Sequence, residues 1–512
     1  MDLPPLSLFA PLVLLAVAAL SIARPGRRPR ALPRLAEGAA LAALAVGVAG
    51  LGQLLIAGPV TLPGLIRLDA VSATMVVLVS FVGWVVVRYA RSYLDGEARE
   101  GAFHGLLLAA LAAVNLQVQA ANLAVLAAGF IATGLVIKQL LMFYPDRAEA
   151  RRAAAKFTLV WGAGDAALIL AAALLWHAFG TIGIADLTAA AGAGLPLAAK
   201  LAVALLVIAA ALKTAAFPLH GWLTEVMEAP TPVSALLHAG IINGGGLLLI
   251  RLAEVVQASP GAMAALVMLG GLTAIFGAAV MLTQSAVKTA LAWSTVAQMG
   301  FMLLQCGLGL WALAMLHIVA HSLYKAHAFL ASGGAVQAVL SVRRPGPVAA
   351  PGLAAVARSF ALALVLYAVV ATGFGLIAGP KSAQALALGT ILILGVAYLV
   401  AQGLADAAPR ALTRHTARAS LAAAVAYFGF HVLAGVLWGT HLPAPPAPGP
   451  LEWGLIVLAL GSFGLVAVAQ ALFPLWAHHP STAGLRVHLA NGLYLNAVLD
   501  RLIGGLKTAK SN

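Results

Sequence analysis

Runs of apolar residues, each about 20 residues long and almost free of charge, follow one another along nearly the whole chain of 512 residues. A helix of this length crosses the hydrocarbon core of a bilayer and satisfies its backbone hydrogen bonds internally. Charged residues make up 9% of the chain, whereas soluble domains contain about 25%. The sequence therefore predicts an all-α polytopic membrane protein with about 14–15 transmembrane helices. The expected spans lie near residues 5–23, 36–58, 69–88, 102–121, 122–143, 157–178, 197–217, 231–250, 261–283, 287–307, 311–339, 352–379, 384–405, 419–440 and 451–476.

The basic residues predict how the chain is oriented in its membrane. The formal net charge is +14, with 30 lysines and arginines. With the N-terminus outside, about 22 of these fall on the cytoplasmic side and about four on the outer side, as the positive-inside rule describes. We therefore expect a protein of the cell inner membrane, with an outside N-terminus and a cytoplasmic C-terminus, rather than a nucleic-acid-binding protein. The first span lacks a basic leader and a small-residue cleavage site, so we expect a retained helix.

Two classes of protein are disfavoured by the composition. The single cysteine, Cys306, permits neither a disulfide framework nor an iron–sulfur cluster within this chain. Neither a glycine-rich dinucleotide motif after a strand nor a P-loop occurs, so nucleotide binding is not expected. We expect no cofactor in this chain.

The seventh expected span carries a lysine at membrane depth. Lys213 costs about 2.5–3.5 kcal/mol there on insertion scales, and Pro218, which removes a backbone donor, predicts a break in the helix. Carbonyl groups freed at a break can hold a cation or water beside the lysine. Glu225 and Glu228 follow the break, and His238 lies about two turns into the next span. A proton-carrying Lys213 is favoured; a lysine that extends from a helix end toward water is the alternative.

Three histidines and a lysine lie close together in the eleventh expected span. His317, His321 and Lys325 recur at four-residue spacing, so they form one stripe about 12 Å long on a helix face, and His327 lies off it. Ionisable residues in a row within a membrane are typical of proton relays. Two alternatives stay open: histidines with purely structural hydrogen bonds, and a zinc site. The run lacks the glutamate of H-E-x-x-H and has no evident third ligand.

Two further ionisable residues fall in or beside spans. Asp165 lies inside the sixth span, where it can pair with a lysine in a relay or bond neighbouring hydroxyl groups. Lys288 begins the tenth span, where it can extend to the membrane surface. Ser294, Thr295 and Gln298 follow on the same helix and would continue a hydrated line inward, which favours a role for Lys288 in a proton path.

The final segment, residues 481–512, is less apolar than the spans before it. Apolar residues recur in it at near-helical spacing, at Leu485, Leu489, Leu493, Val498 and Leu502. The pattern predicts an amphipathic helix, which either lies on the cytoplasmic surface or docks a partner subunit. The polar candidates for docking are His488, Asn491 and Tyr494.

Four stretches of the sequence resemble the antiporter-like membrane subunits of respiratory complex I and the Mrp sodium/proton antiporters. They are RLDAVSATM (67–75), KTAAFPLHGWLTEVMEAPTPVSALLHAG (213–240), AVKTALAWSTVAQMGFM (286–302) and HIVAHSLYKAHAFLASG (317–333). The resemblance implies two inverted five-helix repeats, each with a broken helix, around a polar axis. It implies proton-path roles for Lys213, His238, Lys288, His317, His321 and Lys325, and Asp165 matches an acid in the family's sixth span. We add Glu225 and Glu228 to this path.

The resemblance and the apolar runs together predict the organisation of the chain. Glycine or proline interrupts apolar spans near 200–230 and 360–385, in corresponding halves, as transporters often do. Residues 144–156 are expected to be a polar connection. The expected parts are N-terminal helices (1–100), a first repeat (101–255), a second repeat (256–410), C-terminal helices (411–480) and an amphipathic cytoplasmic tail (481–512).

Several positions depart from the pattern of the family's pumping members. Phe130 and Ile131 stand where those members carry a tryptophan–glutamate pair, Gly162 replaces an arginine, and Ala286 replaces an acid. The family's broken twelfth helix carries a lysine followed by an acid, whereas only Lys381 lies near that place here. These departures put the second half-channel and stand-alone pumping in question.

A shorter branch of the same superfamily fits better. The added His327 and the stretches VAYLVAQGLAD (396–406) and HLANGLYLNAVLDRL (488–502) look like DabB, the membrane subunits of two-part inorganic carbon uptake systems. This resemblance implies a DabA-like cytoplasmic partner, related to β-carbonic anhydrases, that holds the zinc. It implies that a flow of protons or sodium drives CO2 hydration and bicarbonate accumulation, so the chain would be a coupling subunit and not an enzyme. The alternatives are a proton-pumping subunit of complex I or a membrane hydrogenase, and an Mrp-type antiporter subunit.

Overall fold

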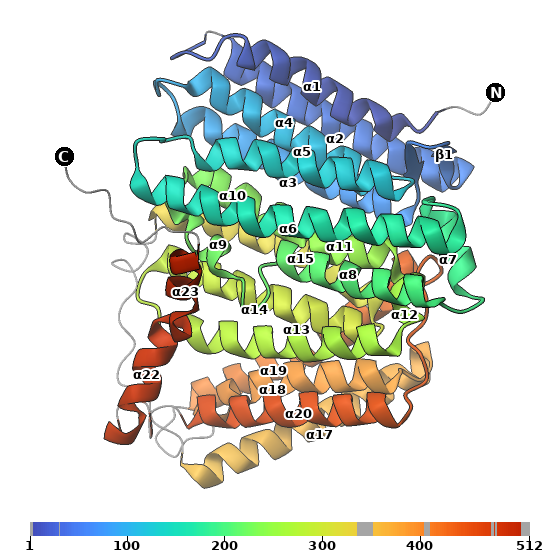
Figure 1. Ribbon diagram of the computed structural model, residues 1–512. Helices are drawn as coiled ribbons and strands as arrows, with labels where there is room; N and C mark the ends of the chain where they lie inside the picture. The colour runs from blue at the N-terminus through green and yellow to red at the C-terminus, as the bar shows by residue number, and fades with distance from the viewer. Residues whose placement is uncertain are drawn as a thin grey trace.

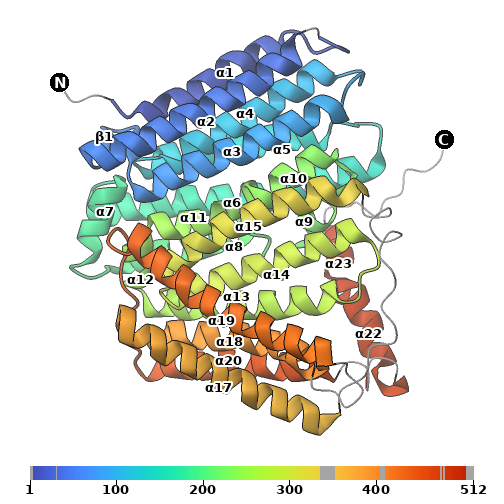
Figure 2. The same ribbon diagram turned by 180° about the vertical axis from the view of Figure 1, so that it is seen from behind.

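The computed structural model describes residues 4–29, 31–334, 352–403, 410–472, 476 and 479–502, and most of them are helical. The long helices run side by side, with their ends gathered at two opposite faces (Figures 1 and 2). We call one the tail face, because α22 (Ala483–Ala490) and α23 (Leu495–Leu502) lie there, and the other the hairpin face, because it carries β1 (Val60–Leu62) and β2 (Ile66–Leu68). The other long helices are α1 (Phe9–Ile22), α2 (Leu32–Ala57), α3 (Ala70–Tyr93), α4 (Glu100–Val118), α5 (Leu123–Leu141), α6 (Ala148–Phe179), α8 (Leu197–Lys213), α13 (Pro260–Met281), α14 (Val287–Gly307), α15 (Trp311–Ala331), α17 (Leu353–Ala378), α18 (Ala383–Gly403), α19 (Arg410–Trp438) and α20 (Pro450–Ala471).

The polytopic helical architecture is confirmed. Within the described residues, 10 helices are long and apolar enough to cross a membrane, and two shorter apolar helices accompany them. Each of the expected spans coincides with a helix or with a broken helix. The connection expected over residues 144–156 is wrong in extent, because α6 already begins at Ala148 and includes Lys156. The segment AEARRAAAK is polar but rich in strong helix formers, which extend the helix beyond the apolar run.

The first expected break is confirmed. α8 ends at Lys213, and the chain then passes through α9 (Gly221–Thr224) and η2 (Val226–Glu228) before α10 (Thr231–Ala239) begins. Pro218 cannot donate to a continuing helix, and the Phe217 amide instead donates to Thr273 Oγ1 at 3.1 Å.

The next span is also interrupted, whereas the second expected break does not fall within a helix. α10 ends before Gly240, and the span continues through η3 (Ile241–Asn243) to α11 (Gly244–Arg251). In the second half, α17 is continuous to Ala378, and residues 379–380 lie in the connection to α18. The two halves therefore differ at the place where the resemblance implied a matching broken helix.

The helices stack in three groups, with α1–α5 at one end, α6–α15 in the middle and α17–α20 at the other end (Figures 1 and 2). Small residues allow α13 and α14 in the middle group to approach closely. A Cβ atom at Gly270 would lie 2.4 Å from the amide nitrogen of Leu304, and one at Gly300 would lie 2.4 Å from that of Ala274. Close backbone packing of this kind drives helix association in lipid, where apolar burial contributes little.

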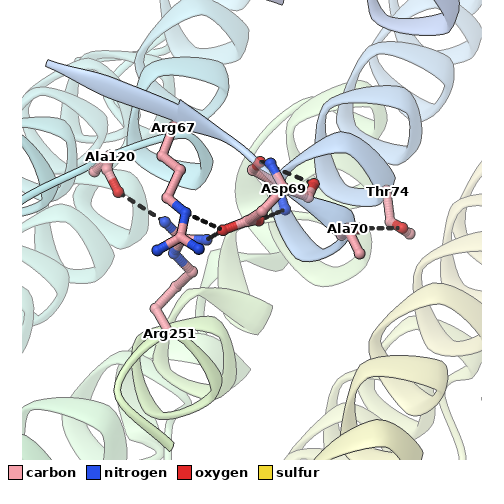
Figure 3. A network of polar contacts seen from close by, with 7 residues as sticks. Arg67, Asp69, Ala70, Thr74, Ala120 and Arg251 are labelled. Carbon is pink, nitrogen blue, oxygen red and sulfur yellow. Dashed lines mark hydrogen bonds and ion pairs between the residues drawn. The ribbon is translucent and has the colours of Figure 1, made fainter. Parts of the chain in front are cut away.

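A polar network joins separate elements at the hairpin face (Figure 3). The Arg251 guanidinium pairs with Asp69 Oδ2 at 2.7 Å and donates to the carbonyl oxygen of Ala120 at 2.9 Å. Asp69 also caps α3 by accepting from the Ser72 amide at 2.9 Å, and Arg67 Nε lies 3.4 Å from its Oδ2. Burial alone would raise the pKa of Asp69, but Arg251, Ser72 and Arg67 together hold it below its ordinary value. The network links the hairpin, α3, α11 and the turn after α4.

Arg251→Met is expected to lower the free energy of unfolding by about 3–5 kcal/mol, because it leaves the mostly buried Asp69 without its closest cation. The matched control is Arg67→Met, which removes a more distant and partly exposed cation and should cost less than about 1 kcal/mol. Thermal unfolding of the purified protein in detergent, followed by tryptophan fluorescence, measures both. Equal effects of the two substitutions would contradict the assigned importance of Arg251.

Candidate functional site

Lys213 is fully buried and pairs with an acid from the neighbouring helix. Its Nζ lies 2.6 Å from Asp165 Oδ1. It also lies over two aromatic rings, 4.4 Å from the centroid of Phe130 and 4.1 Å from that of Trp161. Ile131, at the position of the family's glutamate, is partly exposed on the surface of α5. Asp165 on α6 therefore supplies the negative charge, and the aromatic faces supply further stabilisation of the ammonium.

His238 and His321 connect three helices in the middle of the bundle. His238 Nδ1 lies 3.1 Å from Thr295 Oγ1 on α14, and its backbone oxygen lies 3.1 Å from His321 Nε2 on α15. The ring of Phe329 stacks on that of His238, with centroids 4.3 Å apart. Both histidines are buried, and His238 Nε2 has no hydrogen-bond partner among the described residues. An imidazole with one bonded and one free nitrogen can take and release a proton without leaving its place.

The predicted stripe on α15 is present. His321 and Lys325 are buried in the bundle and His317 is half-buried beside them, whereas His327 is exposed, as its spacing suggested. The rings of His317 and His321 have centroids 5.9 Å apart. Within the part of the chain that the structure describes, no group of three or more histidine, cysteine or acidic residues is arranged to hold a metal ion.

Lys325 lies at the end of the stripe, and the hydrogen bonds described for it go only to uncharged groups. Its Nζ donates to the backbone oxygen of Leu291 at 3.0 Å and to Ser294 Oγ at 2.8 Å, both on α14. Ser294 and Thr295, which the sequence placed on a hydrated line, thus contact Lys325 and His238 respectively. Nearby, Asn243 donates to Ser322 Oγ at 3.0 Å, which adds a polar contact between η3 and α15.

A cavity of about 510 Å³ lies beside the stripe, between α15 and the helices α18 and α19. Its lining includes His317, His321, Gln298, Gln305 and Tyr427. His317 Nδ1 lies 2.9 Å from Gln305 Oε1, while its Nε2 has no hydrogen-bond partner among the described residues. The cavity has room for several water molecules beside groups that can bind them.

Three of the predicted path residues lie apart from Lys213. Lys288, at the start of α14, donates through its Nζ to Thr231 Oγ1 at 3.1 Å. Glu225 does not pair with Lys213; its Oε1 lies 2.5 Å from Nζ of Lys156 on α6. Glu228 belongs to η2, but its side chain lies outside the described part of the structure.

The tail forms two short helices instead of the single amphipathic helix that the spacing predicted. Gly492, Leu493 and Tyr494 all take positive φ values and separate α22 from α23. Leu485 and Val498 of the predicted apolar stripe are about half exposed, at 52% and 53%. The docking candidates His488, Asn491 and Tyr494 are exposed, and the rings of His488 and Tyr494 meet edge to face, with centroids 5.6 Å apart.

Sequence reasoning missed Lys156, which is fully buried between two acids. Besides Glu225, it contacts Asp500 Oδ1 at 2.7 Å and donates to Asn496 Oδ1 at 2.7 Å, both on α23. The signal that was overlooked is the alanine-rich segment before it, which extends α6 and carries the lysine into the bundle. Its partners lie 69 and 340 residues away, so no local pattern identifies them.

Buried lysines and histidines with a paired acid beside a broken helix are typical of membrane subunits that move ions. Residues 120–404 match the model of the transmembrane family NADH:quinone oxidoreductase/Mrp antiporter, and residues 55–104 match that of the N-terminus of chain 5 of NADH-ubiquinone oxidoreductase (complex I). The fold is similar to a chain in the structure of the Mrp complex from Dietzia sp. DQ12-45-1b, with a TM-score of 0.57 and 23% identity over 98% of this chain and 56% of that chain.

Relatives narrow this assignment. The chain is 37% identical over 451 residues to the probable inorganic carbon transporter subunit DabB2 of Halothiobacillus neapolitanus, covering 85% of this chain and 79% of that protein. It is 42% identical over 287 residues to the probable inorganic carbon transporter subunit DabB of Hydrogenovibrio crunogenus. This match covers 56% of this chain and 55% of that protein. NADH-quinone oxidoreductase subunit L of Mycobacterium tuberculosis is 30% identical over 460 residues, or 85% of this chain and 69% of that one. The chain belongs to the NADH:quinone oxidoreductase/Mrp antiporter family, in its DabB branch.

Asp165→Asn is expected to destabilise the protein by about 1–3 kcal/mol, because it leaves the Lys213 ammonium with aromatic faces and no acid. The same substitution in a Lys213→Met background should cost much less, because no charge then needs compensation. Thermal unfolding of the two single variants and the double variant in detergent gives the coupling energy. Strictly additive effects would contradict a direct ion pair.

Proposed function

We propose that this chain is the membrane subunit of an energy-coupled inorganic carbon uptake system, in which cation flow along the buried polar residues drives a cytoplasmic partner. The observation that carries the proposal is a set of four buried residues, Lys213, His238, His321 and Lys325, with the partly buried Asp165. It occurs in a chain whose relative over most of its length is named an inorganic carbon transporter subunit. The partner would be a DabA-like zinc protein related to β-carbonic anhydrases, as the resemblance implies. The zinc belongs to that partner, and this chain contributes no catalytic residue.

In this proposal, the polar residues exchange protons through bound water. The Lys213 ammonium can release its proton toward His238 when its ion pair with Asp165 weakens. His238 and His321 pass a proton between bonded and free ring nitrogens. Lys325 receives it as an amine, held by Ser294 Oγ and a backbone carbonyl. The alternative coupling ion is sodium. Its ligands would be hydroxyl groups and the backbone carbonyl groups freed at the helix break.

The departures from the pumping members support a coupling role over stand-alone pumping. Ile131 stands where the pumping members carry a glutamate, and α17 is continuous and contains no lysine. The identity to subunit L of complex I supports the alternative, a redox-driven proton-pumping subunit; an Mrp-type antiporter subunit is the third candidate. Mass spectrometry of co-purified proteins distinguishes them: a large zinc protein supports the first, quinone-reductase subunits the second.

The proposed setting is the cell inner membrane, with the N-terminus outside and the tail face toward the cytoplasm. The excess of lysine and arginine on that side of the predicted topology supports it. His488, Asn491 and Tyr494 would then present an exposed surface on the cytoplasmic side, where a soluble partner can reach them.

His321→Ala and Lys325→Ala should each abolish energy-coupled bicarbonate uptake while the complex still assembles, because each removes a buried proton-carrying group. The matched control is His327→Ala on the exposed side of the same helix, which should keep most of the uptake. Uptake is measured with labelled inorganic carbon in a host that lacks carbonic anhydrase. Full uptake by either buried-site variant would refute the assigned roles.

Deletion of residues 481–512 should release the partner subunit, because it removes the proposed docking surface. Since the deletion also removes Asn496 and Asp500 from Lys156, the paired variant His488→Ala/Tyr494→Ala tests the exposed surface alone. Both should reduce co-purification of the zinc protein by about tenfold, or roughly 1.4 kcal/mol. Undiminished co-purification with both variants would contradict docking at the tail.

A further inference from the structure

A second ion cluster lies toward the tail face, apart from the Lys213 pair. Lys156 contacts Glu225 Oε1 at 2.5 Å and Asp500 Oδ1 at 2.7 Å, and it donates to Asn496 Oδ1 at 2.7 Å. The Asn496 amide also donates to Glu225 Oε1. The lysine is fully buried, yet it faces two acids, so the cluster has one more acid than it needs for neutrality.

The tail helix α23 packs closely against this cluster. Gly221, at the start of α9, permits the approach, because a Cβ atom there would lie 2.2 Å from Asn496 Oδ1. Leu499 and Asp500 are buried at 7% and 8% exposure, although they lie near the end of the described chain. Glu225 Oε2 is buried and has no hydrogen-bond partner among the described residues. Asp500 Oδ1 faces Lys156 as an ion pair but likewise has no hydrogen-bond partner among the described residues, so each acid of the cluster keeps an oxygen that can accept.

Aromatic rings separate this cluster from the Lys213 pair. Phe157 follows Lys156 on α6 and stacks on Trp161, with centroids 5.2 Å apart, and Lys213 lies over Trp161. Trp222 meets Phe157 at 5.3 Å and Trp161 at 6.1 Å. Lys156 and Asp165 are nine residues apart on α6, so the two clusters lie about 13 Å apart along the helix axis.

The indole N–H of Trp222 is a polar group within this aromatic layer. Trp222 is fully buried, and its Nε1 has no hydrogen-bond partner among the described residues. A buried indole N–H normally finds a partner. A water molecule there would lie in the aromatic layer that separates the two clusters.

We propose that Lys156, Glu225 and Asp500 form the tail-side mouth of the proton path, and that α23 supplies Asp500 as one of its working groups. The inference rests on the proposed function, since it extends the same path. A proton from the tail-side water binds the Glu225 carboxylate, and Lys156 is then balanced by Asp500. The proton crosses the aromatic layer through water to the Lys213 amine, which becomes an ammonium paired with Asp165, and Glu225 returns to a carboxylate. One proton moves, and the reverse sequence carries it outward.

The same helix faces both the path and the outside. Asn496 and Asp500 lie in the cluster, whereas Val498 on α23 is 53% exposed and Tyr494, just before the helix, is 43% exposed. A partner bound to the exposed side would act on the position of Asp500. This gives a physical route by which partner binding controls the mouth of the path.

The test uses the intact two-subunit complex and four variants. Asp500→Asn keeps the size of the side chain but removes its charge, and Lys156→Met removes the cation; each should lower energy-coupled uptake of labelled inorganic carbon by about tenfold or more. Asp500→Glu should restore at least half of the uptake, because it returns the acid, and His327→Ala on the exposed side of α15 should keep most of the uptake. Co-purification of the partner and the unfolding temperature are measured for each variant.

The outcomes separate this inference from the proposed function. If Lys325→Ala is inactive but Asp500→Asn has normal uptake, the path stands and the mouth is overturned. If Lys325→Ala is also active, the proposed function itself fails. Loss of uptake in both Asp500→Asn and Asp500→Glu, together with a lower unfolding temperature, means that Asp500 is only structural and overturns its role in proton transfer. Loss in Asp500→Asn alone, with an unchanged unfolding temperature, supports the proposal.

Discussion

A charge that is buried in a membrane bundle needs a partner, because the surrounding hydrocarbon cannot replace its water. This constraint organises the polar parts of the chain. Arg251 pairs with Asp69, and Lys213 pairs with Asp165. Lys156 pairs with two acids, Glu225 and Asp500. Each pair draws together elements that are far apart in the sequence, so the ion pairs help to determine which helices become neighbours.

Lys325 is the informative exception. The hydrogen bonds described for it end on a backbone carbonyl and a serine hydroxyl, with no carboxylate among them. A lysine held only by neutral acceptors can keep two hydrogen bonds as a neutral amine, because the amine still has two N–H donors, whereas a lysine in an ion pair loses an attraction. The end of the stripe is therefore better suited to taking and releasing a proton than the paired lysines are, and it lies one turn from His321, which lines a cavity that can hold water.

The sequence was sufficient for the spans, because an apolar run of about 20 residues has few other stable forms. It was also sufficient for the stripe, since four-residue spacing places His317, His321 and Lys325 on one helix face whatever surrounds them. It was not sufficient to predict where the helices end or which residues pair with the buried charges. The alanine-rich start of α6 reads as a polar connection, and the acid that pairs with Lys213 depends on how two helices pack. The break expected within the span near residues 360–385 was wrong, because glycine and proline are equally suited to a turn between helices.

The contrast between the two halves bears on how such a chain could couple ion flow to work. The first half has a broken helix with two separate ion clusters, whereas α17 in the second half is unbroken and contains no lysine. A chain with one half-channel still needs a second element that alternates with it. Such an element must reach the first half from outside the helix bundle and must carry its own charge. α23 satisfies both conditions, because Asp500 brings a charge to Lys156 while Leu499 packs into the apolar core and Val498 is exposed on the same helix. In the proposed function, a partner bound to the exposed side of α23 is therefore linked through one short helix to Lys156 and to Glu225, which is the connection that coupling requires.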